Sequence, residues 1–241
     1  MKNLLERLVL SLFPKRCAYC GRVIRADDYE CAKCRNELPR IVGTTCMKCG
    51  REKDKCSCKG AEKYYVSVAA PFYFSGCVRK GVHAFKFRKN RRNSEAYSLE
   101  MAQTVKEKFG NVEFDYITEV PMTQKSIEQR GYNQCFLLAK GVAEKLGIEH
   151  KSQILSKLYE TDKQHAINFY LRKGNLTGVF DVNIPDTVAG KTILLCDDIS
   201  TSGETLNECA KMLWLYGAKE IYCITVALTE YRKNNNKYTL L

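Results

Sequence analysis

The segment from Ile193 to Thr205 constrains the fold of this chain more than any other stretch. A run of apolar residues from Ile193 ends in two adjacent carboxylates, Asp197 and Asp198, and a short loop rich in hydroxyl groups and glycine follows. A helical pattern then opens at about Glu204. An apolar run of this kind is typical of a strand buried in a parallel sheet. The sequence therefore predicts a buried strand, a tight loop and a helix here.

The residue types in this loop suit a phosphorylated sugar. The first turn of a helix leaves backbone N–H groups unpaired at its positive dipole end, where a phosphate binds favourably. Gly203 lets the backbone approach a ligand closely, and the two carboxylates can accept hydrogen bonds from ribose hydroxyls or help to hold a hydrated Mg²⁺ ion. The expected ligand-binding residues are Asp197, Asp198, Ser200, Thr201, Ser202, Gly203, Glu204 and Thr205. The alternative interpretation is an ordinary strand and helix joined by an acidic turn.

The same pattern resembles the motif that binds 5-phosphoribosyl-1-pyrophosphate (PRPP) in type I phosphoribosyltransferases. The resemblance implies PRPP as the ligand and Mg²⁺ as the cofactor that accompanies it. Purine-salvage relatives carry an Asp, usable as a base, at the position of Thr201. Its absence here argues against hypoxanthine or guanine as the acceptor.

Eight of the thirteen cysteines lie between residues 17 and 58, in closely spaced pairs. A Cys-x2-Cys turn places two thiolates on one metal ion, and two such turns complete a tetrahedral Zn²⁺ site. Because no export signal is expected, structural zinc explains the cysteines better than a disulfide framework or redox-active pairs. The spacing predicts one site formed by Cys17, Cys20, Cys31 and Cys34 and a second formed by Cys46, Cys49, Cys56 and Cys58. Spacing alone leaves open a single zinc ion, or ligands interleaved between the two sets.

The net charge of +12 is concentrated in two parts of the chain. Residues 1–60 carry fourteen basic and seven acidic residues, and residues 79–92 carry seven basic residues and no acidic one. This local excess favours a surface for a polyanion, and Phe85 and Phe87 among the cations suit the stacking of single-stranded bases. The residues expected to contact single-stranded DNA are Lys86, Arg88, Lys89, Arg91 and Arg92. The alternative is that both rings lie in the core and the charges form a solvated loop.

The composition shifts near residue 62, from cysteine pairs and charges to longer apolar periodic segments. The expected domains are residues 1–61, an N-terminal helix with a small Cys-rich zinc-ribbon module, and residues 62–241. Strands that alternate with helices in the second part predict an α/β fold with a mostly parallel sheet. The expected strands cover 64–74, 114–120, 191–196 and 221–228, the expected helices cover 78–87, 95–109, 133–146 and 204–216, and 150–180 and the tail after 233 are expected to be irregular.

Residues 4–13 form an apolar helical stripe that Glu6 and Arg7 interrupt, and no small-residue cleavage site follows, which argues against a signal peptide. No stretch approaches the roughly 18 apolar residues that a membrane span requires. The stripe is expected to pack on the protein itself, with membrane contact as the alternative, and the protein is expected in the cytoplasm. None of the three histidines has a sequence partner typical of catalysis. Residues expected in the core include Trp214, Cys77, Cys135, Cys196, Cys209 and Cys223.

Further motifs lie between the cysteine pairs and the Asp197–Asp198 loop. They are Val120-Pro121-Met122, then Arg130-Gly131-Tyr132-Asn133, then Leu155-Ser156-Lys157 and Arg172-x-x-Asn175. In this order the chain resembles the ComF family of competence-associated phosphoribosyltransferase-like proteins, over roughly residues 17–228. In that family a double zinc ribbon precedes a domain with the type I phosphoribosyltransferase fold.

The resemblance assigns roles by position. Residues 122–130 correspond to the pyrophosphate-binding loop, and residues 156–175 to the flexible hood that closes over PRPP. The catalytic residues that it implies are Lys125, Arg130 and Lys157. Relatives carry a more Arg-rich loop where this chain has Thr123-Gln124-Lys125-Ser126. The alternative for Arg130 is a solvated charge at the start of a helix.

Two functions are compatible with these features. The family favours a DNA-uptake factor that binds PRPP, Mg²⁺ and single-stranded DNA and works with DNA-uptake or helicase machinery in natural transformation. The alternative is an active cytoplasmic phosphoribosyltransferase of nucleotide or amine metabolism with no role in DNA handling. The acceptor stays open in both, because acceptor pockets are built from variable loops.

Overall fold

The fold is that of a computed structural model, which describes residues 13–56, 58, 62–88, 90–158, 179–234 and 237–240. Residues 4–12 of the expected apolar stripe, residues 159–175 of the expected hood, and Lys89 lie outside the described residues. Within the described part, no helix is long and apolar enough to cross a lipid bilayer.

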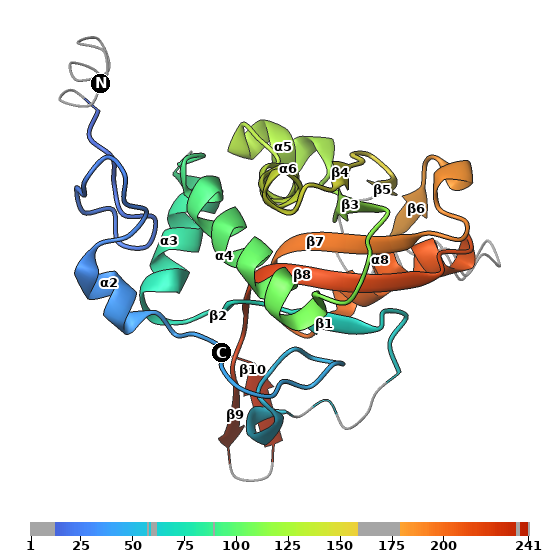
Figure 1. Cartoon of the computed structure of the whole chain (residues 1–241), viewed down its shortest axis with the longest axis horizontal. Coiled ribbons are helices and arrows are strands. Elements are labelled where there is room, and N and C mark those ends of the chain that lie inside the picture. Colours follow the sequence, from blue (N-terminus) through green and yellow to red (C-terminus); the bar gives the residue numbers. More distant parts are fainter. Residues whose placement is uncertain are drawn as a thin grey trace.

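A parallel sheet forms the centre of the molecule (Figure 1). Its strands, in spatial order, are β1 (Ser67–Ala69), β8 (Glu220–Leu228), β7 (Thr192–Ser200), β3 (Tyr116–Glu119) and β4 (Glu149–His150). A further short strand, β2 (Phe72–Tyr73), also runs parallel to β8 beyond the end of β1. Pro71 separates β1 from β2 because proline has no N–H to donate to the ladder, so the strand expected over 64–74 is two short pieces.

Both faces of this sheet are buried, which explains why its strands read as continuous apolar runs. Leu194 and Cys196 of β7 belong to the core beneath α4 (Asn93–Phe109) and α6 (Gln134–Leu146). The alternate residues Ile193 and Leu195 point the other way, into the core shared with α8 (Glu204–Leu215). The C-terminal ends of the parallel strands therefore meet at one edge of a rigid three-layer structure.

The loop expected after the proline is instead helical. Helix α5 (Gln124–Arg130) begins after Thr123, whose side-chain oxygen accepts a hydrogen bond from the N–H of Ser126 at 3.3 Å. It ends at Gly131, which has a φ of 79°, a left-handed conformation that glycine adopts without strain. The seven-residue helix was not predicted because it has no buried residue, and hence no apolar periodicity.

Other expectations of irregular structure were also wrong. The described residues from 150 to 182 include two short strands, β5 (Leu155–Lys157) and β6 (Phe180–Val182), which pair antiparallel. The tail forms a second antiparallel pair, β9 (Tyr231–Asn234) with β10 (Lys237–Leu240). Strands this short carry too few alternating residues to give a recognisable period, so they were not distinguished from loops.

The first cysteine-rich segment packs against the helical layer. It includes helix α2 (Ala32–Glu37), and it lies beside helix α3 (Gly76–Phe87) at the left of Figure 1. The ring of Tyr19 packs edge-on against Phe72 and Tyr97. The backbone oxygen of Ala18 accepts hydrogen bonds from Asn93 at 2.9 Å and from the Tyr97 hydroxyl at 3.0 Å. This segment therefore shares the core of the sheet domain.

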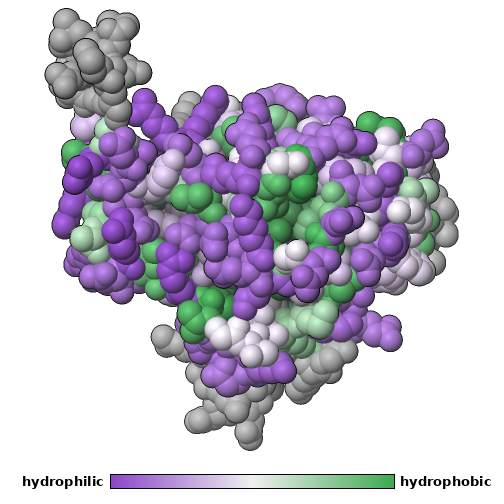
Figure 2. All heavy atoms as spheres, viewed as in Figure 1, coloured by the Kyte–Doolittle hydropathy of each residue, from purple (hydrophilic) through white to green (hydrophobic). Residues whose placement is uncertain are grey.

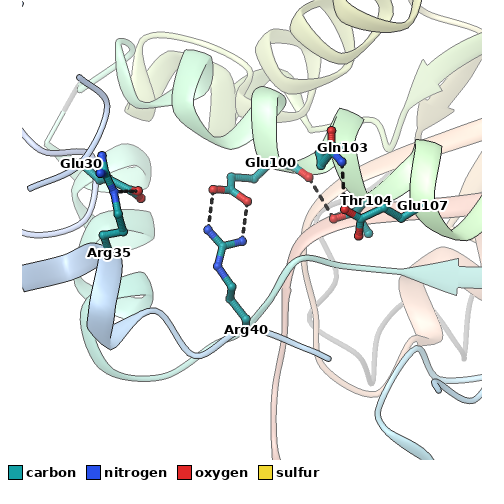
Figure 3. A network of polar contacts seen from close by, with 7 residues as sticks. All are labelled: Glu30, Arg35, Arg40, Glu100, Gln103, Thr104 and Glu107. Carbon is teal, nitrogen blue, oxygen red and sulfur yellow. Dashed lines mark hydrogen bonds and ion pairs between the residues drawn. The ribbon is translucent and has the colours of Figure 1, made fainter. Parts of the chain in front are cut away.

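The second cysteine-rich segment, which includes the short 3-10 helix η1 (Lys53–Lys55), lies elsewhere, below β1 in Figure 1. The connection between the two segments is tied to α4, as Figure 3 shows. There Arg40 makes two hydrogen bonds, of 2.7 and 2.9 Å, with the two carboxylate oxygens of Glu100. Because the Arg40 side chain is substantially exposed, this pair fixes geometry more than it adds stability.

Candidate functional site

The structure brings the eight N-terminal cysteines together in two groups of four. The sulfur atoms of Cys17, Cys20, Cys31 and Cys34 lie within 4.8 Å of one another, and so do those of Cys46, Cys49, Cys56 and Cys58. Individual sulfur–sulfur distances are 3.7 Å for Cys20 and Cys31, and 3.6 Å for Cys46 and Cys58. Four thiolates at about 2.3 Å from one zinc ion stand roughly 3.8 Å apart, so both groups fit a tetrahedral Zn²⁺ ion.

In each group one cysteine has a surrounding that favours the thiolate form that a metal needs, whereas burial raises the pKa of Cys17, Cys34, Cys49 and Cys56. The N–H of Cys34 points at the sulfur of Cys31 and lowers the pKa of that thiol to about 7. Burial opposes ionisation of Cys46, but the N–H of Cys49 and the neighbouring thiols lower its pKa to about 7 as well. All four positions of each group are occupied by protein sulfur, so a bound zinc ion would have no open position for a substrate.

The two carboxylates lie at the C-terminal end of β7, in the middle of the sheet. The strand extends to Ser200, beyond the expected end at Cys196, so Asp197 and Asp198 belong to the strand and are buried. Pairing with β8 continues through Asp197 and Thr225 to Ser200 and Leu228. The strand end was predicted too early because its last residues are polar, although backbone pairing with β8 continues.

Asp197 is held by local hydrogen bonds. Its Oδ1 accepts from the N–H of Asp198 at 2.7 Å and from the thiol of Cys135 at 3.3 Å. Burial, together with repulsion from Asp198, raises the pKa of Asp197 to about 6 against the opposing N–H of Asp198. Cys135 was expected to be an ordinary core residue, but its thiol contacts the site.

Asp198 forms an ion pair with Lys86, which was expected from the sequence among the residues that contact DNA. The ammonium group of Lys86, near the C-terminal end of α3, lies 2.8 Å from Asp198 Oδ1. Burial alone would lower the pKa of Lys86, but attraction to Asp198 and Asp197 outweighs this effect and raises the pKa. The Lys86 side chain is only 19% exposed and lies at the Asp pair, and its expected contact with single-stranded DNA stays a prediction.

The loop after β7 has the shape of an anion-binding helix start. Gly203 precedes the first residue of α8 with a φ of 78°, and Ser202 Oγ accepts a weak hydrogen bond from the N–H of Glu204 at 3.4 Å. The side chains of Thr201, Glu204 and Thr205 are exposed. The expected ligand residues therefore surround one helix N-terminus, with the Asp pair at its base.

Of the three expected catalytic cations, Lys125 and Arg130 lie on α5 and Lys157 lies on β5, and Arg130 and Lys157 lie near different aromatic rings. Lys125 is exposed in the first turn of α5, and the guanidinium of Arg130 lies 5.6 Å from the ring of Phe87. The ammonium group of Lys157, at the end of β5, lies 5.8 Å from the ring of Phe180. The cation that the structure places against the Asp pair is Lys86, which no sequence motif had indicated as part of this site.

A third carboxylate also lies at this edge of the sheet. Glu119, at the end of β3, is buried, and it pairs with His150 Nε2 at 2.7 Å and accepts from the Ser152 hydroxyl at 2.8 Å. No sequence motif indicated this group, because Glu119 lies about thirty residues before His150 and Ser152. Its position beside β7, where Glu119 is in register with Cys196, puts it next to the Asp pair.

The remaining basic residues line two grooves between the first cysteine segment and the helices. One groove, of about 440 Å³, includes Lys15, Arg16, Arg91 and Arg92, and the other, of about 590 Å³, includes Arg79, Lys80 and Arg88. None of the described residues that line them is acidic. We call the two together the basic groove. Hydrophilic side chains cover much of the left of the molecule in Figure 2, where Figure 1 shows the first cysteine segment and α3.

Phe85 and Phe87 were expected either to stack on bases or to lie in the core, and the structure differs for the two rings. Phe85 is fully buried in the core, whereas Phe87 is 64% exposed and lies near His83. Arg91 is partly committed to structure, because its side chain donates to the backbone oxygen of Gly131 and lies over the ring of Tyr132. Trp214 was expected in the core but is 54% exposed, on the outer side of α8 against Tyr64.

Comparisons with known proteins match this arrangement. Residues 8–63 match the double zinc ribbon domain family, and residues 133–239 match the phosphoribosyl transferase domain family. The chain is 28% identical over 213 residues to the DNA utilization protein YhgH of Salmonella typhi, covering 86% of this chain and 88% of the relative. It is 22% identical over 204 residues to competence protein ComFC of Bacillus subtilis, and the match covers 79% of this chain and 80% of the relative. It is 23% identical over 223 residues to competence protein F of Haemophilus influenzae, and that match covers 88% of this chain and 96% of the relative.

These matches and the parallel sheet confirm the expected fold class, a type I phosphoribosyltransferase fold preceded by a Cys-rich zinc-ribbon module. The two groups of four cysteines fall within the part that matches the double zinc ribbon. The Asp pair and the loop before α8 fall within the part that matches the transferase domain. The chain therefore combines a double zinc ribbon with a phosphoribosyl transferase domain, as the resemblance to the ComF family implied, and its relatives include proteins named DNA utilization protein YhgH, ComFC and competence protein F.

Proposed function

We propose that this protein binds PRPP together with Mg²⁺ at the C-terminal end of β7. The observation that carries the proposal is the pair of buried carboxylates, Asp197 and Asp198, directly before a glycine-containing helix start. In this arrangement the N–H groups of the loop receive the 5′-phosphate, and the Asp pair receives the ribose hydroxyls or the hydrated metal ion. Lys86 balances the charge of the Asp pair. One Zn²⁺ ion in each cysteine group has a structural role only.

The reaction that such a site supports is transfer of phosphoribose to a nucleophile. Departure of pyrophosphate leaves positive charge on the ribose, so catalysis depends on positioning and on cations that stabilise the leaving group. Lys125, Arg130 and Lys157 are proposed for that role when PRPP is bound. Incubation with Mg²⁺, PRPP and candidate acceptors, followed by measurement of pyrophosphate release, tests the transfer. Release that depends on an acceptor supports it, and no release with amine or base acceptors leaves binding alone.

Binding itself is tested by calorimetry with the double variant Asp197→Asn, Asp198→Asn. Loss of the charge-assisted contacts should weaken Mg²⁺-dependent PRPP binding by roughly a hundredfold or more. A matched control changes the exposed acids Glu113→Gln and Asp186→Asn, which lie outside the site, and should leave the affinity unchanged. Equal PRPP affinity in the Asp197, Asp198 variant and the wild type would contradict the assignment.

A second function is favoured by the basic groove, which suits single-stranded DNA. It combines seven cationic side chains with the exposed ring of Phe87 nearby, and two of the relatives are named competence proteins. Cations that follow a phosphate backbone and rings that stack on bases are the means by which single strands are bound without sequence preference. We propose that the protein handles incoming single strands in the cytoplasm during DNA uptake, alongside the DNA-uptake machinery.

The salt dependence of DNA binding tests this second function. If about four cations contact phosphates, the logarithm of the affinity should fall with the logarithm of salt concentration with a slope near −3, at ~0.7 per contact. Changing Arg79, Lys80, Arg88 and Arg92 to Ala should flatten the slope and leave PRPP binding intact. The control changes Lys106, Lys140, Lys145 and Lys219, which lie outside the groove. An equal loss of DNA affinity in the control would show an effect of net charge and favour a transferase without a DNA role.

A further inference from the structure

Arg51 connects the second cysteine group to the loop that precedes α8. It lies two residues after Cys49, which ends the Cys46–Cys49 turn, and its side chain is almost completely buried. The guanidinium donates to the backbone oxygen of Thr201 at 2.8 Å and to the backbone oxygen of Thr229 at 2.8 Å. A longer contact of 3.4 Å reaches the backbone oxygen of Cys49. One buried cation thus ties the cysteine turn, the end of β8 and the candidate phosphate loop together.

The position of Arg51 depends on the cysteine turn that carries it. The N–H of Cys46 donates to the backbone oxygen of Arg51 at 2.7 Å, and the turn is fastened to the sheet where the N–H of Val68 donates to Met47 at 3.0 Å. Gly50 allows this close packing, because a Cβ there would lie 2.8 Å from Leu228 Cδ1 and 2.9 Å from the oxygen of Val68. A zinc ion bound by the four sulfurs would fix the turn and with it the direction of Arg51.

The contact with Thr201 has a consequence for the loop. A peptide group is planar and trans, so its C=O and its N–H point in opposite directions. Because Arg51 holds the oxygen of Thr201, the N–H of Ser202 is directed away from the cysteine turn. The N–H of Ser202, the residue before Gly203, is one of those that a phosphate at the start of α8 would contact. Thr229 supports the same oxygen, since its hydroxyl lies 3.3 Å away.

We propose that the second cysteine group, acting through Arg51, holds the loop from Thr201 to Gly203 in its phosphate-binding shape. Arg51 is a positioning residue in this scheme, because it binds the loop and not the ligand. The affinity for PRPP then depends on zinc in the second group and is independent of zinc in the first, whose neighbours are α3 and α4. The link to PRPP rests on the proposed function, whereas the link to the shape of the loop does not.

The variants Arg51→Met and Arg51→Lys test the connection in the full-length, zinc-loaded protein. Both remove the forked contact with the backbone oxygens of Thr201 and Thr229, and Arg51→Lys keeps the charge. Hydrogen exchange at the amides of Ser202, Gly203, Glu204 and Thr205 should accelerate in both variants, and PRPP affinity should fall at least about tenfold. Zinc content, measured by elemental analysis, should stay at the wild-type value. Unchanged exchange and unchanged affinity would overturn the proposal.

A matched pair of cysteine variants separates the two groups. Cys58→Ser weakens the second group and should reproduce the fast exchange and the weak PRPP binding of the Arg51 variants. Cys20→Ser weakens the first group and should leave both properties as in the wild type. Equal effects of the two variants would overturn the proposal, because they would show general destabilisation. If the wild type binds no PRPP, the proposed function fails, and the exchange rates of the loop amides still decide whether Arg51 holds the loop.

Discussion

At the scale of single residues, the two neighbouring carboxylates of β7 are stabilised in different ways. Asp198 is paired with Lys86 at 2.8 Å, whereas Asp197 relies on an N–H and a thiol, and its pKa is raised to about 6. A buried carboxylate with a raised pKa reduces the stability of the folded state at neutral pH. Functional sites often contain such unfavourable groups, because the same groups bind the ligand.

Asp197→Asn should therefore stabilise the ligand-free protein in metal-free buffer. The folded-state pKa lies above the unfolded value of 3.8, so the folded wild type loses stability as the pH rises from about 4 to about 6. The variant avoids this loss, and its free energy of unfolding at pH 7 should exceed that of the wild type by roughly 2 kcal/mol. The difference should disappear below about pH 4. Urea denaturation at several pH values measures it, and a gain that is constant from pH 3 to pH 8 would contradict the raised pKa.

Lys86→Met should have the opposite effect on stability. It leaves Asp198 buried without its cation, and removal of one partner of a buried pair costs about 3 kcal/mol. Adding Asp198→Asn removes the unpaired charge and should recover much of the loss. If Lys86→Met leaves stability unchanged and weakens only DNA binding, Lys86 belongs to the DNA surface that the sequence suggested.

At the scale of elements, the long apolar segments were predictable and the short or polar ones were not. Helix α6 was predicted nearly to its ends, because Asn133 caps it and apolar residues repeat along one side. The cysteine groups were predictable because metal ligation fixes spacing in the sequence. Helix α5 has no buried side to give an apolar period, and the β5–β6 pair and the last residues of β7 depend on neighbours distant in the chain. The same holds for Lys86 and Glu119, whose partners lie 112 and 31 residues away.

The contact between α3 and the first cysteine segment gives a prediction at this scale. A Cβ on Gly81 would lie 2.4 Å from the backbone oxygen of Ala18 and 2.5 Å from the hydroxyl of Tyr97. Gly81→Ala should therefore separate the segment from α3 and lower the free energy of unfolding by about 2 kcal/mol or more. Zinc in the first group should become more accessible to a chromogenic chelator.

Gly141→Ala is the matched control for this prediction. Its Cβ would meet Ser98 at 2.5 Å, between α6 and α4 and away from the cysteines. It should destabilise the protein without making zinc more accessible. Equal chelation rates in the two variants would show that Gly81 has no particular role at the first cysteine segment.

At the scale of the whole molecule, α3 lies between the two proposed sites. Arg79, Lys80 and Arg88 of this segment line the basic groove, while Lys86 reaches Asp198 at the edge of the sheet. The cysteine groups adjoin different parts of the same domain. Cys17, Tyr19 and Cys34 are buried with the core beneath α4, and the second group lies against β1 and β8 through Gly50. The zinc-ribbon segments are therefore built into the domain that carries the phosphate loop.

Zinc removal should accordingly destabilise the whole chain. We expect two zinc ions per chain by elemental analysis, and a fall in the unfolding temperature of several degrees when a strong chelator removes them. Both PRPP binding and DNA binding should weaken in the treated protein. An unfolding temperature that does not change on zinc loss would show that the cysteine segments are independent of the domain.

The most direct test of the account is a crystal structure of the protein soaked with Mg²⁺ and PRPP. The account predicts the 5′-phosphate at the N–H groups of residues 202–205, and the ribose hydroxyls or the Mg²⁺ ion at Asp197 and Asp198. Arg51 should keep its contact with the oxygen of Thr201. Density for PRPP at another place, or none at saturating concentration in crystals that leave this edge of the sheet open, would contradict the central claim.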